Sequence, residues 1–219
     1  MFFLDLLRTR RLEKENSIAL IKVLERAEKI VHSVAADKQR VALHDYIRVL
    51  LIPLIWKNIR QEYLNDDHNH SEIKLSEMFP FEVLGYRDDS LTDTNYELHL
   101  GVDLLVPNPW RPKALNQLGF IGHEDNPFEQ NVINHDVTLF LPMRIGYVWR
   151  GHHSIMNGML NHSGTVMPKN VVDCSIHFER YSFDGTNWID SQTKRMWPTP
   201  YPEFGWVWEL SKRYKDVLC

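Results

Sequence analysis

The residues best suited to chemistry stand at one junction, where Gly151 precedes His152, His153 and Ser154. An imidazole titrates near neutral pH, so His152 and His153 are candidate catalytic acids or bases toward a phosphate ester. The residues before Gly151 suggest a strand, and Ser154–Asn161 has helical spacing. The first amides of a helix lack partners within the helix, so such a junction is suited to an anion. We expect any chemistry of the chain here.

Strands and turns surround this junction in the sequence. Asn134–Leu141 and Arg144–Trp149 are predicted strands, and the second leads into Gly151. An earlier alternating stretch, Tyr96–Val106, ends at Pro107–Pro112, whose three prolines favour a rigid extended turn. Beyond the helix the sequence predicts three further strands and a closing helix, at Val166–Val172, Cys174–Phe183, Thr186–Ile189 and Tyr201–Leu218.

The N-terminal part, residues 1–64, is predicted to be a helical hairpin. Apolar residues recur every three or four positions in both halves, and Pro53 is expected to kink or split the second helix. The hairpin is expected to pack on the sheet that follows, as a structural cover. An alternative is an arm that binds a protein partner or a second copy.

The fold class is therefore predicted to be α+β, with a mixed β-sheet and a C-terminal helix. The hairpin would be followed by an acidic, loop-rich connector at 65–95 and by a sheet region at 96–219. Residues 65–136 hold 4 Lys and Arg against 14 Asp and Glu, whereas both flanking parts are mildly basic. This acidic segment is expected to be a solvated face or, alternatively, an interaction surface.

Composition limits the classes of function. The net charge of −4 and the sequence pI near 6.2 are not the global signature of a nucleic-acid binder, although a local basic groove is compatible with them. Cys174 and Cys219 make neither a disulfide framework nor a CxxC zinc motif, which favours a reducing, cytoplasmic compartment. No stretch approaches the roughly 18 apolar residues of a membrane span, so no membrane partner is expected.

Two of these features, taken in order, resemble the ParB/sulfiredoxin-like superfamily, in particular ParB N-terminal-like domains. The first is the turn at Asn108–Pro112, and the second is the Gly-His-His-Ser element about forty residues later. The resemblance covers roughly Tyr96–Asp173 and implies a ParB/sulfiredoxin-like sheet domain whose helix N-terminus holds nucleotide phosphates. It implies phosphate contacts from Gly151, Ser154, Arg150, Asn108 and Arg111, the last of which is equally suited to a salt bridge.

The chain departs from the family pattern at the most charged position of the motif. Ser154 stands where the family has an arginine, which would grip a phosphate through paired, charge-assisted hydrogen bonds. A serine supplies one neutral bond, and Arg150 could approach from the strand instead. His152 stands at the cysteine position of sulfiredoxins, which excludes their thiol chemistry. The motif that clamps a second phosphate in ParB is not recognisable, so CTP-driven sliding on DNA is not implied.

The leading hypothesis is a protein that binds a nucleotide or a nucleic-acid phosphate at Gly151–Ser154. It would be a nuclease or a nucleotide phosphohydrolase or transferase, with Mg²⁺ and a nucleotide as candidate cofactors and His152 and His153 as acid and base. The alternative is a non-catalytic protein-interaction module on a decayed ParB-like frame, with the N-terminal helices as the partner-binding part. A third hypothesis is a metal-dependent hydrolase, in which histidines near the junction, with Asp136 or Asp173, would hold a divalent ion. No metal ligands are assigned, because the neighbouring side chains of His152 and His153 are expected to point in different directions. His68 and His70 belong to a predicted loop that lacks further fixed ligands.

Overall fold

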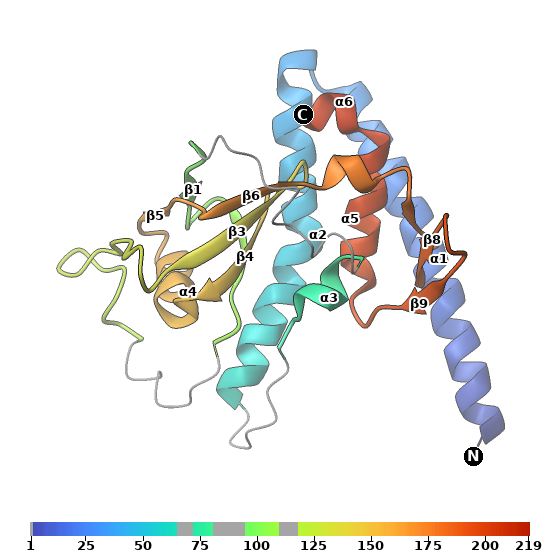
Figure 1. The fold of residues 1–219 in the computed structure, drawn as a ribbon, viewed down its shortest axis with the longest axis horizontal. Coiled ribbons are helices and arrows are strands. Elements are labelled where there is room, and N and C mark those ends of the chain that lie inside the picture. Colours follow the sequence, from blue (N-terminus) through green and yellow to red (C-terminus); the bar gives the residue numbers. More distant parts are fainter. Residues whose placement is uncertain (1, 65–71, 81–94, 110–117) are drawn as a thin grey trace. The chain divides into compact units, whose positions relative to one another are not determined.

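The structure is a computed structural model that describes residues 2–64, 72–80, 95–109 and 118–219, with side chains from residue 11 onward. It is a mixed α+β protein with N-terminal helices, several sheets and a C-terminal helix, as predicted (Figure 1). Among the helices of these described ranges, none combines the length and the apolar character needed to cross a lipid bilayer.

The chain forms two compact units that are interleaved in sequence. Unit 1 contains Met1–Leu50, Ser76–Leu84 and Cys174–Cys219, and unit 2 contains Leu51–Leu75 and Gly85–Asp173. The chain therefore leaves unit 1 within a helix, and it returns to unit 1 for its last part. The division into segments 1–64, 65–95 and 96–219 remains a prediction from the sequence.

Unit 1 begins with helix α1 (Phe2–Ser33) and the first half of α2 (Ala36–Leu64). Pro53 does not end α2, which continues through it, and the division between the units falls just before this proline. The other elements of unit 1 are α3 (Leu75–Met78, whose first residue belongs to unit 2), η3 (Cys174–His177), β7 (Tyr181–Phe183), β8 (Asn187–Asp190), β9 (Met196–Pro198), α5 (Pro202–Arg213) and α6 (Lys215–Leu218).

The core of unit 1 lies between α5 and the antiparallel sheet β7-β8-β9. The indoles of Trp188 and Trp208 meet edge to face, with centroids 5.5 Å apart. A Cβ atom at Gly205 would lie 2.4 Å from the ring of Phe183, so this glycine lets α5 approach the sheet closely. The predicted closing helix is confirmed, and Pro202 stands at its first position, where proline is favoured.

Helix α1 packs along α5 and against the turn between β7 and β8. That turn contains the predicted Asp-Gly pair, and Gly185 has φ 107°. Its Cα approaches the helix so closely that a Cβ atom would lie 2.6 Å from the Cα of Ser17. The Ser17 hydroxyl also lies 3.3 Å from the Asp184 carbonyl oxygen. The N-terminal helix is therefore held by parts of the chain synthesised much later.

Unit 2 is built around a four-stranded sheet with the order β2-β4-β3-β6. Strand β4 runs parallel to β2 and antiparallel to β3, and β3 runs parallel to β6. A separate antiparallel pair, β1 and β5, and helix α4 complete the unit. The elements are β1 (Leu98–His99), β2 (Leu104–Val106), β3 (Asp136–Leu141), β4 (Ile145–Arg150), α4 (His152–Leu160), β5 (Thr165–Val166) and β6 (Asn170–Asp173).

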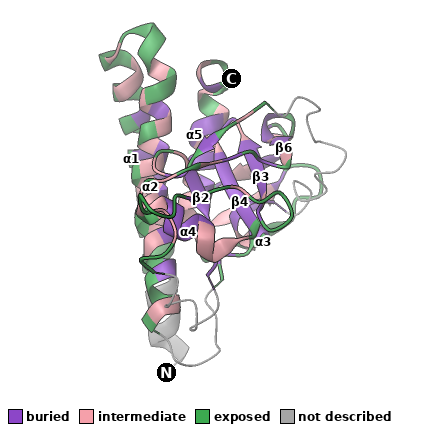
Figure 2. Cartoon of the chain, turned by 90° about the vertical axis from the view of Figure 1, so that its left-hand side faces the viewer, coloured by how far each residue is buried: buried purple, intermediate pink, exposed green. Residues whose placement is uncertain are grey.

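The hydrophobic core of unit 2 joins the sheet to α4. Leu139 and Val148 from the central strands pack in one cluster with Ile155 of the helix, and all three are fully buried. Figure 2 shows β3 and β4 buried along most of their length. Because successive residues of β3 and β4 are buried, both faces of the sheet are covered along these strands.

Three predicted strands are shorter than expected. Tyr96–Val106 is interrupted by a turn, in which Asp103 accepts a hydrogen bond from Arg144 of 2.6 Å. Val166–Val172 is broken at Pro168, which cannot donate to a ladder, so β5 and β6 are separate. Cys174–Phe183 begins with a 3-10 turn, and only its last three residues form β7. Strand β9 was not predicted, because its three residues are too few to show a period.

Candidate functional site

The predicted strand-glycine-helix junction is confirmed in unit 2. Strand β4 ends at Arg150, α4 begins at His152, and Gly151 between them is left-handed, with φ 82°. A Cβ atom at Gly151 would lie 2.2 Å from Cδ2 of His135, so both the backbone angle and the space require glycine. No side chain caps the N-terminus of α4. Its first-turn amides therefore lack the usual side-chain acceptor.

His152 is a neutral hydrogen-bond acceptor at this junction. Its Nδ1 accepts the backbone N–H of Asn108 at 3.1 Å. Burial, and next the neighbouring His153, lower the pKa of His152 to about 4, against the opposing effect of a hydrogen bond to the Trp149 backbone. At neutral pH the ring carries no charge. His152 therefore supplies neither a cation for a phosphate nor a proton for general acid catalysis.

The side chain of Asn108 has a structural role. It is buried, and its Oδ1 accepts the backbone N–H of Ile73 at 3.0 Å and the amide of Asn58 at 3.3 Å. Its Nδ2 donates to the Ile73 carbonyl at 3.1 Å. These bonds tie the end of β2 to α2 and to the chain before α3. Asn108 reaches the junction through its backbone N–H to His152.

Ser154 is paired with a histidine that sequence reasoning left aside. His135 Nε2 lies 2.7 Å from Ser154 Oγ, and the Ser154 hydroxyl is 3.1 Å from the Gly151 carbonyl oxygen. His135 Nδ1 accepts the N–H of Asn131 at 2.9 Å, so the proton of the neutral ring is on Nε2. Ser154 thus accepts from His135 and donates to Gly151. A serine nucleophile needs the opposite polarity, with the histidine as acceptor.

The remaining predicted contacts are distributed around the junction. His153 begins the same helix as His152, with its side chain partly buried. The Arg150 side chain is exposed, and Arg150 pairs in register with Asp136, which forms an ion pair with Lys169 at 3.4 Å. Arg111, His68 and His70 lie outside the described residues. Within the ranges that the structure describes, no group of three His, Cys, Asp or Glu residues is arranged to hold a metal ion.

A buried amide in α4 also escaped sequence reasoning. Asn157 is fully buried, and neither its Oδ1 nor its Nδ2 makes a hydrogen bond. A signal for it exists in the sequence, because Asn157 interrupts the apolar residues Ile155, Met156 and Met159.

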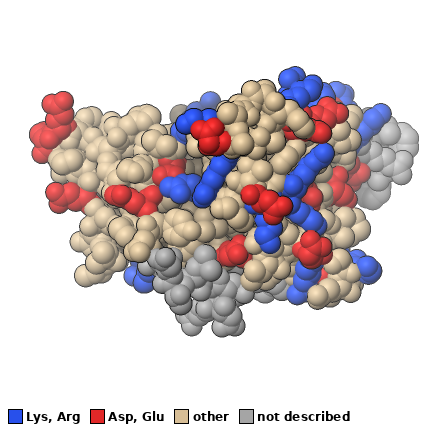
Figure 3. All heavy atoms as spheres, turned by 90° about the horizontal axis from the view of Figure 1, so that it is seen from above, with Lys and Arg blue, Asp and Glu red and all other residues tan. Residues whose placement is uncertain are grey.

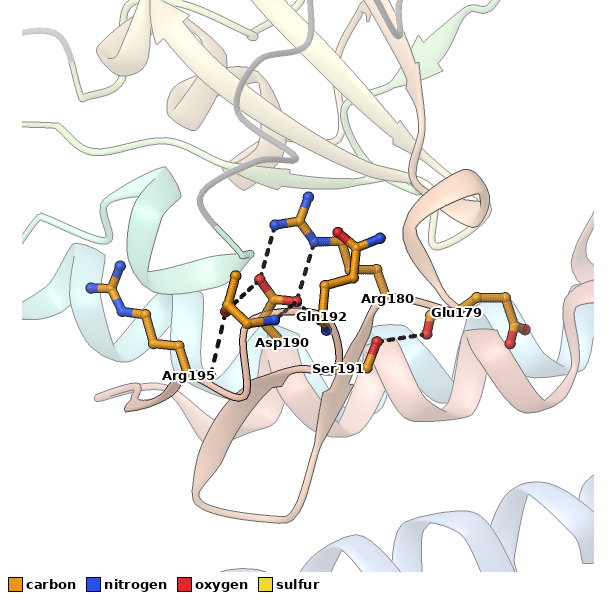
Figure 4. Close-up of polar contacts among 7 residues, drawn as sticks. Glu179, Arg180, Asp190, Ser191, Gln192 and Arg195 are labelled. Atoms are coloured by element: carbon orange, nitrogen blue, oxygen red, sulfur yellow. Dashed lines mark hydrogen bonds and ion pairs between the residues drawn. The ribbon is translucent and has the colours of Figure 1, made fainter.

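A second polar cluster lies in unit 1, at the turn between β8 and β9 (Figure 4). Asp190 accepts two bonds from Arg180, of 3.2 and 2.9 Å, and further bonds from the Gln192 and Thr193 backbones and the Thr193 hydroxyl. Arg180 first, and these donors next, hold the pKa of Asp190 well below its usual range. The carboxylate is therefore fully engaged in shaping its own turn, so this cluster is structural.

Comparison with known proteins gives one match. The model of a family described as "Family of unknown function (DUF6710)" matches residues 8–217, which is nearly the whole chain. Neither a curated protein nor a solved structure gives a significant match.

Proposed function

The chain belongs to the DUF6710 family, whose function is unknown, and we propose that it binds a nucleotide or nucleic-acid phosphate at the N-terminus of α4. The observation that carries the proposal is the left-handed Gly151 before a helix that no side chain caps. The N–H groups at a helix N-terminus and the helix dipole both favour an anion at such an end. The exposed guanidinium of Arg150, one residue before the glycine, would add the charge that Ser154 lacks.

The topology of unit 2 supports the resemblance to ParB/sulfiredoxin-like domains. That resemblance implies a strand with a proline turn, then a strand, a glycine, a helix, a glycine and another strand. In unit 2 these are β2, then β4, Gly151, α4, Gly164 and the short β5, which is followed by β6. Strand β2 pairs in parallel with β4, and β3 pairs in parallel with β6. Under this proposal the phosphate would lie where the expected family site lies.

The geometry of the junction favours phosphate binding over catalysis by His152, which is one of the two predicted catalytic residues. His152 is neutral, with Nδ1 occupied, and Ser154 accepts a bond from His135. Phosphoryl transfer with Mg²⁺ would therefore rest on His153. Figure 3 shows one face, on which basic and acidic side chains are interspersed. The formal net charge of −4 favours a small nucleotide over a long nucleic acid.

Titration calorimetry of the whole protein tests the proposal. Pyrophosphate, ATP, CTP, GTP, UTP and a short oligonucleotide would each be titrated with and without Mg²⁺, and at least one should bind. Arg150→Glu should weaken binding about tenfold or more, since it reverses a charge beside the anion. Arg60→Glu is the matched control, because Arg60 is exposed on the part of α2 that belongs to unit 2. Absence of binding by every ligand would overturn the proposal.

A second candidate, a protein-interaction module, is favoured by the apolar surface of unit 1. The first two helices expose large apolar side chains, each at least 41% accessible: Leu12, Ile18, Ile21, Val41 and Val49. Burial of such side chains drives association. Sedimentation over a range of concentrations tests whether a second copy covers them. Self-association that Ile21→Lys abolishes would support this candidate, whereas a monomer at all concentrations would count against it.

A further inference from the structure

The buried amide of Asn157 destabilises the folded state, and no hydrogen bond to a described residue compensates for this. The side chain is fully buried, and its Oδ1 and Nδ2 make no hydrogen bond to a described residue. The backbone carbonyl of Asn157 accepts from Asn161. A buried polar group without a partner destabilises the folded state, and leucine, which has the same branched shape, would avoid that penalty. The fold alone therefore gives no reason for an asparagine here.

Helix geometry directs this amide toward the proposed phosphate site. Asn157 follows His153 by four residues, so the two share one face of α4. A helical Cα–Cβ bond tilts toward the N-terminus, which places the Asn157 side chain over the turn that begins at the junction. Ile155 lies in the core cluster on the sheet side of the helix. Asn157 lies away from that side.

A described loop covers this face of the helix. The Asn157 carbonyl would be 3.2 Å from a Cβ atom at Gly122, and Asn161 Nδ2 donates to the Ile121 carbonyl at 3.0 Å. The amide is thus enclosed between the first turn of α4 and the loop around Gly122. A ligand group that reached it from the junction would have to displace this loop, which is attached to α4 through the Asn161 bond.

The distance along the helix fits a ligand longer than a phosphate. With a rise of about 1.5 Å per residue, an anion at the first-turn amides would lie roughly 8 Å from the Asn157 amide. Inorganic phosphate cannot span that distance, whereas a nucleotide carries a sugar and a base beyond its phosphates. An asparagine amide offers a donor beside an acceptor, and it pairs with a base edge of the same kind, such as N6 and N7 of adenine.

Resting on the proposed phosphate site, we propose that Asn157 is a specificity-determining residue that pairs with the nucleobase of the bound nucleotide. The unpaired amide in the ligand-free protein would then be matched only when the base enters. Pairing with the base would then explain the buried asparagine, because the hydrogen bonds formed on binding would compensate for its destabilising effect in the ligand-free protein. A site with such a group discriminates against ligands that leave the group unpaired.

Calorimetry and thermal unfolding of the full chain test this role together. The wild type should bind its preferred nucleotide, among ATP, CTP, GTP and UTP, at least about tenfold more tightly than pyrophosphate. Asn157→Leu should leave pyrophosphate binding unchanged, remove the preference for the base, and raise the Tm. Asn161→Leu is the matched control on the same face: it should lower the Tm through loss of the Ile121 bond and keep the preference.

The outcomes separate this inference from the proposed function. A nucleotide preference that persists in Asn157→Leu would overturn the inference, and so would a lower Tm of this variant with unchanged binding. Equal affinity of the wild type for pyrophosphate and nucleotides would overturn the inference while the phosphate site stands. No binding of either would overturn both. If Asn157→Leu does not fold, Asn157→Asp replaces it: loss of the amide donor should reduce the base preference, and an unchanged preference would overturn the inference.

Discussion

His135 donates a hydrogen bond of 2.7 Å from Nε2 to the hydroxyl of Ser154, and its other nitrogen accepts the Asn131 amide. The same ring stacks on Phe128, with centroids 4.9 Å apart, and its Cδ2 occupies the space that a side chain at Gly151 would need. The pair therefore braces the chain before β3 against the first turn of α4. Its polarity makes it a structural support of the junction.

Ser154→Ala should destabilise the protein, because it leaves a buried imidazole N–H without an acceptor. The expected loss is about 1–3 kcal/mol in the free energy of unfolding, measured by urea denaturation. His135→Phe keeps a ring against Phe128. In a double-mutant cycle, each of the two substitutions should lower the free energy of unfolding less in the presence of the other than it does alone. Additive effects of the two substitutions would contradict a stabilising contact between His135 and Ser154.

Gly151→Ala and Gly119→Ala form a matched pair of left-handed glycines. Their φ angles are 82° and 84°, but no atom of the described residues lies within 4 Å of a Cβ atom at Gly119. Gly119→Ala should therefore cost only the backbone penalty, about 1–2 kcal/mol. Gly151→Ala must also move the His135 ring, which should add about 1–3 kcal/mol. Equal urea midpoints for the two variants would show that the ring contact is unimportant.

Stability should fall on acidification because His152 is neutral in the fold. Its pKa is about 4 in the folded state and 6.5 in the unfolded state, so the unfolded chain binds the proton more strongly. The stabilisation is complete above pH 6.5 and is lost as the pH falls through about 4. At about 1.4 kcal/mol per pH unit, it amounts to at most about 3 kcal/mol.

Urea unfolding at several pH values measures this contribution. His152→Gln should flatten the dependence of the unfolding free energy on pH between about 4 and 6.5. His123→Gln is the control, because His123 is exposed in the same unit. The same slope for His152→Gln and the wild type would contradict the assignment.

Asp190→Asn should destabilise unit 1 more than Asp184→Asn. The Asp190 carboxylate is buried against Arg180, whereas Asp184 is exposed and accepts only the backbone N–H groups of Thr186 and Asn187. Because the pKa of Asp190 is lowered in the fold, its contribution is present above the unfolded pKa and is lost as the pH falls. The urea midpoints should therefore differ at neutral pH and converge in acid.

Local sequence was sufficient for the elements that depend on near neighbours. The glycine junction, the Asp184–Gly185 turn and the C-terminal helix are specified by residues a few positions apart, and each is found as predicted. The resemblance to ParB/sulfiredoxin-like domains and the phosphate site remain predictions. Arg111 lies outside the described residues.

Contacts across long separations could not be foreseen. His135 reaches Ser154 through the register of β3 on β4, and Asn108 turns to Ile73, 35 residues away. From the sequence, both polar side chains could belong to a ligand site. Only the tertiary packing shows which hydrogen-bond partners they have. The same holds for the His152 ring, whose low pKa results from burial at the junction rather than from its histidine neighbour alone.

The interleaving of the two units determines the order in which their elements can pack during synthesis. Helix α1 leaves the ribosome before unit 2, whereas α5, on which it packs, begins at Pro202 and leaves the ribosome after unit 2. All of unit 2 has been translated once Asp173 has emerged, and domains generally fold as units during synthesis. The nascent chain must therefore carry α1 without its packing partner while unit 2 forms, and a message truncated after Asp173 would leave that helix permanently without it.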